Sequence, residues 1–420
     1  MAPRSRLKAQ REGLRPYLSQ DQMARKIGVD RKTVWRWEVG EADPYDRHLP
    51  LIAEHYDWPL DRIPELLARD DEPAVGASEP ATSVPDVDGI GAIELIRRTE
   101  ATDVGSGTVS AIVHAVERLA TSYTHMVPAE LLASLRTYQS YVMRLLDGRA
   151  TLAQRRELTR QAGWLSLLVA TAAIDVGQDR AAAANFDAAR VMARESGDDQ
   201  LAAWVFETEA WQALSTGRFD RAAALCRAGL DLVGSNTSAH VQLCTQAARA
   251  AARLGDRRET RRRVDQAMTE IDRLPSAVGP EHHFTADRDR VLLHCAAALV
   301  WLADGDATTE EYARRSVDTY EPGDYAHHLA TARMNLAILL ADTDQPAEAA
   351  HLGQQAIIEA AWRLCRTDLL LTDDLNRTLT GRYDASEVQF WTEAYTETRR
   401  AIMTRQPELT ASTSTPPAIG

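Results

Sequence analysis

The feature that most constrains the fold is a repeated pattern of two helices joined at a glycine. Three successive stretches show it, with turn glycines 40 and 38 residues apart: Gly177, Gly217 and Gly255. After a longer insertion, Gly305 and Asp344 take the same place. A small residue stands seven positions before each turn, where two helices can cross closely: Ala170, Ala210, Ala248, Ala298 and Ala337. Such helix pairs bury their faces only by stacking, so at least three must form one superhelix.

The stretches that carry this pattern, such as "VFETEAWQALSTGRFDRAAALCRAGLDLVGS", resemble tetratricopeptide repeats. Those repeats pair helices at a period near 34 residues. The period here is longer, so the elbows or second helices are expected to be extended. From about residue 89 the chain is rich in Ala, Leu and Arg and has little strand signal. We therefore predict an all-α chain in which residues 89–403 form an α-solenoid of tetratricopeptide-like helix pairs, followed by a disordered tail at 404–420.

Residues 1–69, the head, are predicted to form five short helices. Gly28 ends the second helix, and Asp30 caps the third. The apolar side of the third helix carries Val34 and Trp37, three positions apart. Two helices joined by this turn make a helix-turn-helix unit.

The stretch "LSQDQMARKIGVDRKTVWRWEVGEADP" resembles the XRE, or lambda-repressor/Cro-like, DNA-binding domain. In that pattern Gln opens the second helix, a small residue follows, Gly marks the turn, and W-E-x-G ends the third helix. The matching residues are Gln20, Ala24, Gly28, Trp37, Glu38 and Gly40. The pairing of such a head with a tetratricopeptide-like body is found in actinobacterial regulators. The resemblance implies a five-helix, Cro-like fold and a transcription factor controlled by a ligand or partner.

Charge supports double-stranded DNA as the partner of the head. Residues 1–37 hold ten Lys or Arg against three acids, a net +7, in a chain of net charge −13. In the resembling fold the third helix enters the major groove, where Arg or Lys reads guanine and Thr meets a thymine methyl. The resemblance also implies that Gln20 holds a phosphate. The predicted DNA-binding residues are Gln20, Lys26, Arg31, Lys32, Thr33, Trp35 and Arg36.

Two alternatives stay open on this face. Trp35 either packs on a sugar or thymine methyl, or covers the next helix. The whole face is alternatively a solvated charged surface.

Residues 70–88 are predicted to be a flexible acidic linker. They contain no Lys or Arg, and Pro73, Pro80 and Pro85 stand among acids and small residues. Such a composition cannot bury enough apolar surface to fold.

A ligand would lie against the first helices of successive pairs, which line the concave face of a superhelix. The register of the turns places these residues there: Trp164, Trp204, Glu207, Thr208, Trp211, Gln246, Arg249 and Asn335. In tetratricopeptide grooves an amide at the place of Asn335 binds peptide backbone. Aromatic faces with a few polar groups suit a peptide or a mid-sized apolar molecule. The alternative is that the tryptophans are core.

The residues support neither an enzyme nor a metal or cofactor site. The four cysteines, Cys226, Cys244, Cys295 and Cys365, lie in apolar helical patterns and are expected to be buried. The adjacent pairs His282–His283 and His327–His328 are not expected to face one site. No run of about 18 apolar residues predicts a membrane span, and the charged N-terminus lacks a secretory h-region. We therefore expect a cytoplasmic protein, nucleoid-associated when it binds DNA.

Two functions follow. The first is a sequence-specific DNA-binding transcriptional regulator, a homodimer on an inverted-repeat operator, because paired heads suit two-fold sites. Its repeat domain would dimerise, sense a peptide or small-molecule signal, or do both. The second is a protein–protein scaffold or adaptor that acts through the groove, with the DNA-binding head secondary.

Overall fold

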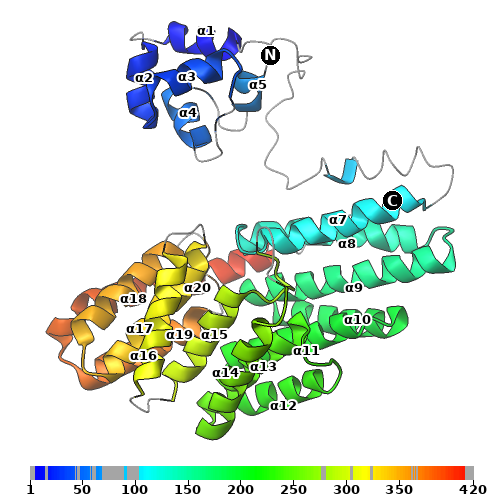
Figure 1. Ribbon diagram of the computed structural model, residues 1–420, viewed down its shortest axis with the longest axis vertical. Helices are drawn as coiled ribbons and strands as arrows, with labels where there is room; N and C mark the ends of the chain where they lie inside the picture. Colours follow the sequence, from blue (N-terminus) through cyan, green and yellow to red (C-terminus); the bar gives the residue numbers. More distant parts are fainter. Residues whose placement is uncertain are drawn as a thin grey trace. The chain divides into compact units, whose positions relative to one another are not determined.

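A computed structural model describes residues 5–14, 18–42, 44, 48–56, 58, 63–68, 89–91, 104–275, 281–302, 306–321, 325–360, 363, 365 and 368–411. Within these ranges the regular structure is helical and no strand occurs, which confirms the all-α prediction (Figure 1). The chain divides into two compact units, Met1–Ser83 and Val84–Gly420. Three predicted regions lie outside the described residues: the linker at 70–88, the turn at Gly305, and residues 412–420 of the tail.

The first unit contains five helices around one apolar core. They are α1 (Ser5–Gly13), α2 (Gln20–Ile27), α3 (Arg31–Glu38), α4 (Leu49–His55) and α5 (Ile63–Leu67). Each helix contributes a buried side chain to this core, namely Leu7, Met23, Trp37, Ile52 and Leu66 in chain order. The number of helices agrees with the prediction for the head.

Local signals in the sequence set the turn between α2 and α3. Ser19 and Gln22 form a capping box at the start of α2. Gly28 ends α2 in the left-handed conformation, with φ of 79°, which glycine adopts without steric cost. The Asp30 carboxylate then accepts a hydrogen bond from the Thr33 amide at 2.9 Å and so starts α3.

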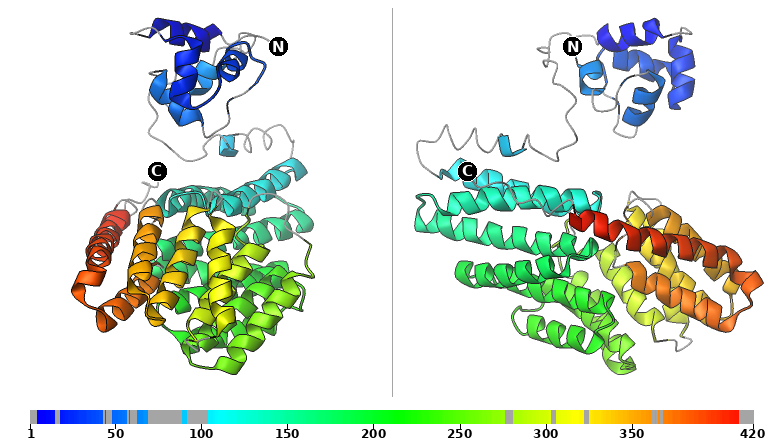
Figure 2. Two further views of the ribbon diagram at one scale, coloured as in Figure 1. Left: turned by 60° about the vertical axis from the view of Figure 1, so that its left-hand side comes forward. Right: turned by 180° about the vertical axis from the view of Figure 1, so that it is seen from behind.

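The second unit is a stack of longer helices (Figures 1 and 2). They are α7 (Ser106–Ser122), α8 (Pro128–Leu146), α9 (Leu152–Asp175), α10 (Asp179–Ser196), α11 (Asp199–Ser215), α12 (Phe219–Leu230), α13 (Ser238–Arg253), α14 (Arg257–Ile271), α15 (Arg288–Val300), α16 (Ala307–Tyr320), α17 (Ala326–Asp342), α18 (Pro346–Ala360), α19 (Leu369–Arg382) and α20 (Ala385–Ala411). The helices pack as pairs, and α11, α13, α15, α17 and α19 also pack on one another in that order. This stacking confirms the solenoid-like architecture.

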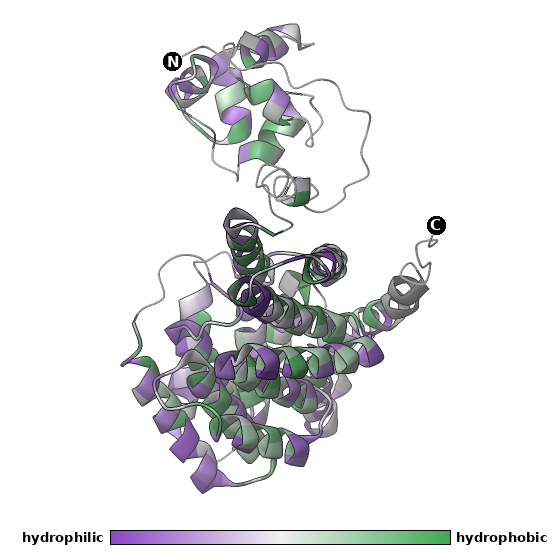
Figure 3. Cartoon of the chain, turned by 90° about the vertical axis from the view of Figure 1, so that its right-hand side faces the viewer, coloured by the Kyte–Doolittle hydropathy of each residue, from purple (hydrophilic) through white to green (hydrophobic). Residues whose placement is uncertain are grey.

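The repeat signals occupy the places expected of them. The turn residues Gly177, Gly217, Gly255 and Asp344 all have positive φ, between 65° and 78°. The five small residues seven positions before the turns are fully buried: Ala170, Ala210, Ala248, Ala298 and Ala337. Hydrophilic residues lie on the outward faces of the peripheral helices, and hydrophobic residues lie between the helices (Figure 3). One boundary differs, because α20 runs to Ala411 instead of ending at 403.

Two connections close the concave side of the second unit. The segment 281–287, between α14 and α15, reaches α7, where the His283 amide donates to the Ala120 carbonyl at 3.2 Å. Near the end of the unit, Arg363 donates to the Tyr123 carbonyl at 2.8 Å and lies 3.6 Å from the Asp175 carboxylate. The last helices therefore contact the first ones, and the space between them becomes a cavity.

Candidate functional site

The first candidate site is the outer side of α3. Val34 and Trp37 are buried in the core, so the residues between and before them face outward. Arg31, Lys32 and Arg36 are exposed, and Trp35 is 41% exposed. Lys26 is exposed on α2. The structure therefore gathers the predicted basic residues on the surface of the helix-turn-helix.

Most of the charge on this face has no carboxylate partner. Within the described residues no ion pair forms with Lys26, Arg31 or Lys32. Arg36 lies 3.9 Å from the carboxylate of Glu41, and both side chains are about half exposed. Solvent screens so loose a pair, which leaves Arg36 available to a stronger anion.

Two other predicted residues are held in place from within the unit. The Thr33 hydroxyl donates to Asp30 Oδ2 at 2.9 Å, so its methyl group is the part left for another molecule. The Thr33 amide bond also lowers the pKa of Asp30. Gln20 Nε2 donates at 2.7 Å to Glu38, which is buried and paired with Arg11 at 2.6 Å. The sequence analysis did not predict this Arg11–Glu38–Gln20 network, because Arg11 lies on α1, outside the motif.

The second candidate site is the cavity of the second unit, with a volume of about 120 Å³. It is lined by α11, α13, α15 and α17 and by parts of the segment 281–287, and it is partly open to solvent. Seven of the eight predicted groove residues line it: Trp204, Glu207, Thr208, Trp211, Gln246, Arg249 and Asn335. Residues that the sequence analysis did not predict for the groove also line it, including Gln242, Glu281, His283, Arg290, His294, His327, His328 and Thr331.

The repeat register explains which lining residues a sequence can reveal. Trp204, Gln242 and Thr331 each lie six positions before the small alanine of their helix, and all three line the cavity. The same count would have found Gln242 and Thr331. In α15 the register shifts by one, since Leu293 and Ala297 lie five and one before Ala298. Because of this shift, counting positions back from the small alanine does not identify Arg290 or His294.

Trp164 was predicted for the groove but does not line the cavity. Phe284, from the segment 281–287, packs against it with ring centroids 4.9 Å apart, and against Trp204 at 5.5 Å. The Trp164 indole N–H donates to Asp198 at 3.2 Å. The register placed Trp164 correctly on an inner helix, but a segment outside the repeats occupies the space in front of it.

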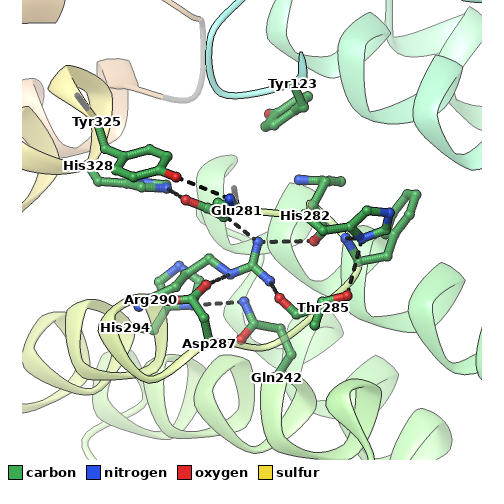
Figure 4. A network of polar contacts seen from close by, with 12 residues as sticks. Tyr123, Gln242, Glu281, His282, Thr285, Asp287, Arg290, His294, Tyr325 and His328 are labelled. Carbon is green, nitrogen blue, oxygen red and sulfur yellow. Dashed lines mark hydrogen bonds and ion pairs between the residues drawn. The ribbon is translucent and has the colours of Figure 1, made fainter. Parts of the chain in front are cut away.

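Arg290 holds the segment 281–287 against α15 and α17 (Figure 4). Its guanidinium donates to Glu281 at 3.2 Å, to the His283 carbonyl at 3.0 Å and to the Thr285 carbonyl. Glu281 is also bonded to His328 Nε2 at 2.8 Å, and its amide donates to the Tyr325 hydroxyl. Burial raises the pKa of Glu281, but His328 and Arg290 outweigh it and hold that pKa well below the usual range.

The structure contradicts one expectation, which concerned His327 and His328. The sequence analysis expected adjacent histidines not to face one site, yet both line the cavity, in the first turn of α17. Burial lowers the pKa of His283, His294 and His327 well below the usual value, so these side chains are neutral at pH 7. Within the described residues no His, Cys, Asp or Glu group has a geometry that could hold a metal ion.

A polar chain crosses the cavity wall from α11 to α13. Gln246 Nε2 donates to Glu207 at 2.8 Å, and Arg249 Nη1 donates to Gln246 Oε1 at 2.8 Å. Burial raises the pKa of Glu207 and lowers the pKa of Arg249 to about 10. The Glu207 carboxylate and the Arg249 guanidinium are therefore both poorly solvated in the cavity wall.

Five lining side chains have buried polar atoms without a hydrogen-bond partner within the described residues. They are Thr124 Oγ1, Gln242 Oε1, Arg290 Nε, His327 Nδ1, and both Nδ2 and Oδ1 of Asn335. Asn335 is the extreme case, since it is 1% exposed and neither of its polar atoms is satisfied. An unmade hydrogen bond of a buried group costs about 1–3 kcal/mol, so such groups in a cavity point to a missing partner.

All four cysteines are buried free thiols, as expected. Within the described part of the chain no helix has both the length and the hydropathy to cross a bilayer. No protein-family model matches the chain, and neither does any curated protein. The function therefore has to be argued from the two sites themselves.

Proposed function

We propose that the chain is a sequence-specific DNA-binding transcriptional regulator whose second unit senses a small molecule. The observation that carries the proposal is the outer side of α3, where Arg31 and Lys32 are exposed, without a carboxylate partner among the described residues, on a helix fixed by a buried core. A charge that is left unpaired on a rigid helix is what recognition of a phosphate backbone and of base edges requires.

The contacts on DNA follow from the position of each side chain. Arg31 and Lys32 lie in the first turn of α3, the end of a recognition helix that reads base edges in the major groove. Lys26 and Arg36, which are both exposed, are proposed to pair with phosphates. Trp35, which is 41% exposed, is accessible to a sugar or a thymine methyl.

Sensing is assigned to the cavity because it combines aromatic walls with polar groups that lack partners. Control of DNA binding then requires that the ligand prefers one arrangement of the second unit, since equal affinity for two arrangements shifts nothing. The contacts of Arg363 with Tyr123 and Asp175 join the two ends of the unit, so an occupant of the cavity acts on both ends.

The scaffold alternative receives less support. A groove that holds an extended peptide has to be open along several repeats, as in helix-in-groove and strand-like recognition. Here Phe284 lies against Trp164 and Trp204, and the remaining space is about 120 Å³. This volume favours a small molecule over a peptide.

We further propose that the regulator acts as a homodimer on an inverted repeat, because a single five-helix unit covers little DNA. Light scattering of the full chain, free and on its site, should give the mass of a dimer. A monomer in both conditions at micromolar concentration would remove this part of the proposal.

Selection from a random pool of double-stranded DNA with the full chain tests the proposed function. We expect enrichment of an inverted repeat whose half-sites lie about 10 base pairs apart, one helical turn. Failure to enrich any sequence, together with no binding of any DNA at low salt, would refute the regulator.

A further inference from the structure

The chemistry of the cavity defines which class of small molecule fits it, an inference that rests on the sensing role just proposed. The cavity measures about 120 Å³. A dry cavity of about 150 Å³ holds benzene. The space in this unit is slightly smaller but partly open, so it encloses about six non-hydrogen atoms and lets a slightly longer molecule reach toward solvent.

Arg249 calls for an anion. Its guanidinium has five N–H donors, and one of them donates to Gln246 Oε1 at 2.8 Å. No carboxylate among the described residues forms an ion pair with Arg249. By contrast, Arg290 in the same wall is paired with Glu281 and with two carbonyls. A half-buried guanidinium without a counter-charge is a strong and directional site for a carboxylate.

The nearby acid forms no ion pair with Arg249 within the described residues, and burial outweighs the rise that its charge gives the pKa of Arg249. Glu207 accepts its hydrogen bond from Gln246, which stands between the two side chains. Burial raises the pKa of Glu207 and so disfavours its anion. The positive charge of Arg249 is therefore left for an occupant of the cavity.

Asn335 calls for an amide. Its Nδ2 donor and Oδ1 acceptor are both buried and both without a partner within the described residues. A ligand satisfies them together if it presents an acceptor and a donor side by side, as the edge of a primary amide does. Trp204, Trp211 and Leu293 supply the apolar part of the wall.

We propose that the cavity binds a small amido acid, a molecule that carries one carboxylate, one amide and a short apolar body. The carboxylate pairs with Arg249, the amide pairs with Asn335, and the apolar body lies against Trp204 and Trp211. The monoamide of a dicarboxylic acid, of the size of malonamate or succinamate, has this chemistry.

Binding of matched probes to the full chain tests the proposal. The probes are malonamate and succinamate, each beside its neutral diamide, and 4-methylpentanoate, which has the shape and carboxylate of succinamate but no amide. Tryptophan fluorescence and the melting temperature report binding, up to about 10 mM, the range of weak binding. We expect at least one of the two amido acids to raise the melting temperature, with at least tenfold higher affinity than its neutral diamide and than 4-methylpentanoate.

Arg249→Met should weaken binding of that acid at least tenfold. Arg227→Met is the matched control, because Arg227 is exposed on α12 and does not line the cavity. Asn335→Leu provides a second test that does not depend on the folding of the first variant. It removes two unsatisfied atoms, so it should stay folded and still bind the acid at least tenfold more weakly.

The proposal is overturned if neither amido acid binds up to about 10 mM, if the acid and its neutral diamide bind equally, or if folded Arg249→Met and Asn335→Leu bind as the wild type does. DNA binding of the same preparations is measured without any acid. If the chain binds DNA but no amido acid, the ligand proposal is wrong and the proposed regulator is unaffected. If it binds an amido acid but no DNA, only the proposed regulator is refuted.

Discussion

At the scale of single residues, Asn335 and Gln246 make a matched pair of buried amides. Neither polar atom of Asn335 has a partner, whereas the Gln246 amide bonds Glu207 and Arg249. Asn335→Leu should raise the free energy of unfolding by about 1–3 kcal/mol, because it removes an unpaid desolvation cost. Gln246→Leu should lower it by a similar amount, because two buried partners are stranded. Urea unfolding measures both, and equal destabilisation by the two variants would contradict this view of Asn335.

How many site residues the sequence reveals depends on the repeat register. Trp204 and Asn335 follow from it because each lies at a fixed distance before a small alanine. Arg290 and Glu281 do not, since one lies on a helix with a shifted register and the other lies in a segment without periodicity. On α3 the sequence likewise predicts that Val34 is buried and that its neighbours are exposed. It also predicts that Thr33 and Gln20 belong to the DNA-binding face, but it does not predict their hydrogen bonds to Asp30 and Glu38.

At the scale of elements, the turn between α2 and α3 depends on Gly28. Its φ of 79° lies in the left-handed region, and a Cβ there would meet no atom within 4 Å. The cost of Gly28→Ala is therefore conformational alone, about 1–2 kcal/mol. Gly13→Ala is the control, because Gly13 also has open space and does not have positive φ. It should leave stability unchanged or raise it slightly. Thermal unfolding of the two variants measures the difference, and equal effects would show that the left-handed turn is not maintained in solution.

The elements around the cavity also predict a dependence on pH. Burial lowers the folded-state pKa of His283, His294 and His327 below 6.5, so the unfolded chain binds more protons as pH falls through that value. Their contribution to stability is therefore present above pH 6.5 and is lost on acidification. Burial raises the pKa of Asp368 to about 6, which has the opposite sign between pH 6 and 3.8. We expect the loss of stability from the three histidines to exceed the gain from Asp368 on acidification.

The melting temperature of the full chain should accordingly fall from pH 7.5 to pH 5.5, and the fall should be smaller in His294→Gln. Within the described residues, His294 forms its side-chain hydrogen bonds through Nδ1, with Gln242 and Thr245. A glutamine at position 294 keeps a polar group that can bond to them. A melting temperature that rises on acidification would contradict neutral buried histidines.

At the scale of the whole molecule, Arg363 joins the two ends of the second unit. Its fully buried guanidinium contacts the Tyr123 carbonyl, the Tyr123 ring and the Asp175 carboxylate. Arg363→Met should cost about 3–5 kcal/mol, because it leaves Asp175 buried without its counter-charge. Arg377→Met is the control, since Arg377 is 72% exposed and its buried partner Asp374 keeps a second ion pair with Arg253. It should cost at most about 0.5 kcal/mol. A comparable loss in both variants, seen in urea unfolding, would argue against the closed arrangement.

The sequence predicts the superhelix but not its closure. Repeat spacing, buried alanines and left-handed turns are local, so they show that helix pairs stack in order. The contact of Arg363 with Tyr123 joins residues 240 positions apart, and no local pattern encodes it. Closure turns a predicted open groove into a cavity of about 120 Å³. Of the two ligand classes that the sequence leaves open, a peptide and a small molecule, this volume favours the small molecule.

The measurement that tests the central claim most directly is the affinity of the full chain for its selected DNA site, by fluorescence anisotropy across a range of salt. Arg31→Ala is compared with Lys8→Ala, which removes one positive charge from the exposed surface of α1. We predict that Arg31→Ala loses about 1–3 kcal/mol of binding free energy and relaxes specificity at one base pair. Lys8→Ala should keep the specificity of the wild type. If Arg31→Ala binds the site as tightly and as selectively as the wild type, α3 does not read DNA and the account is wrong.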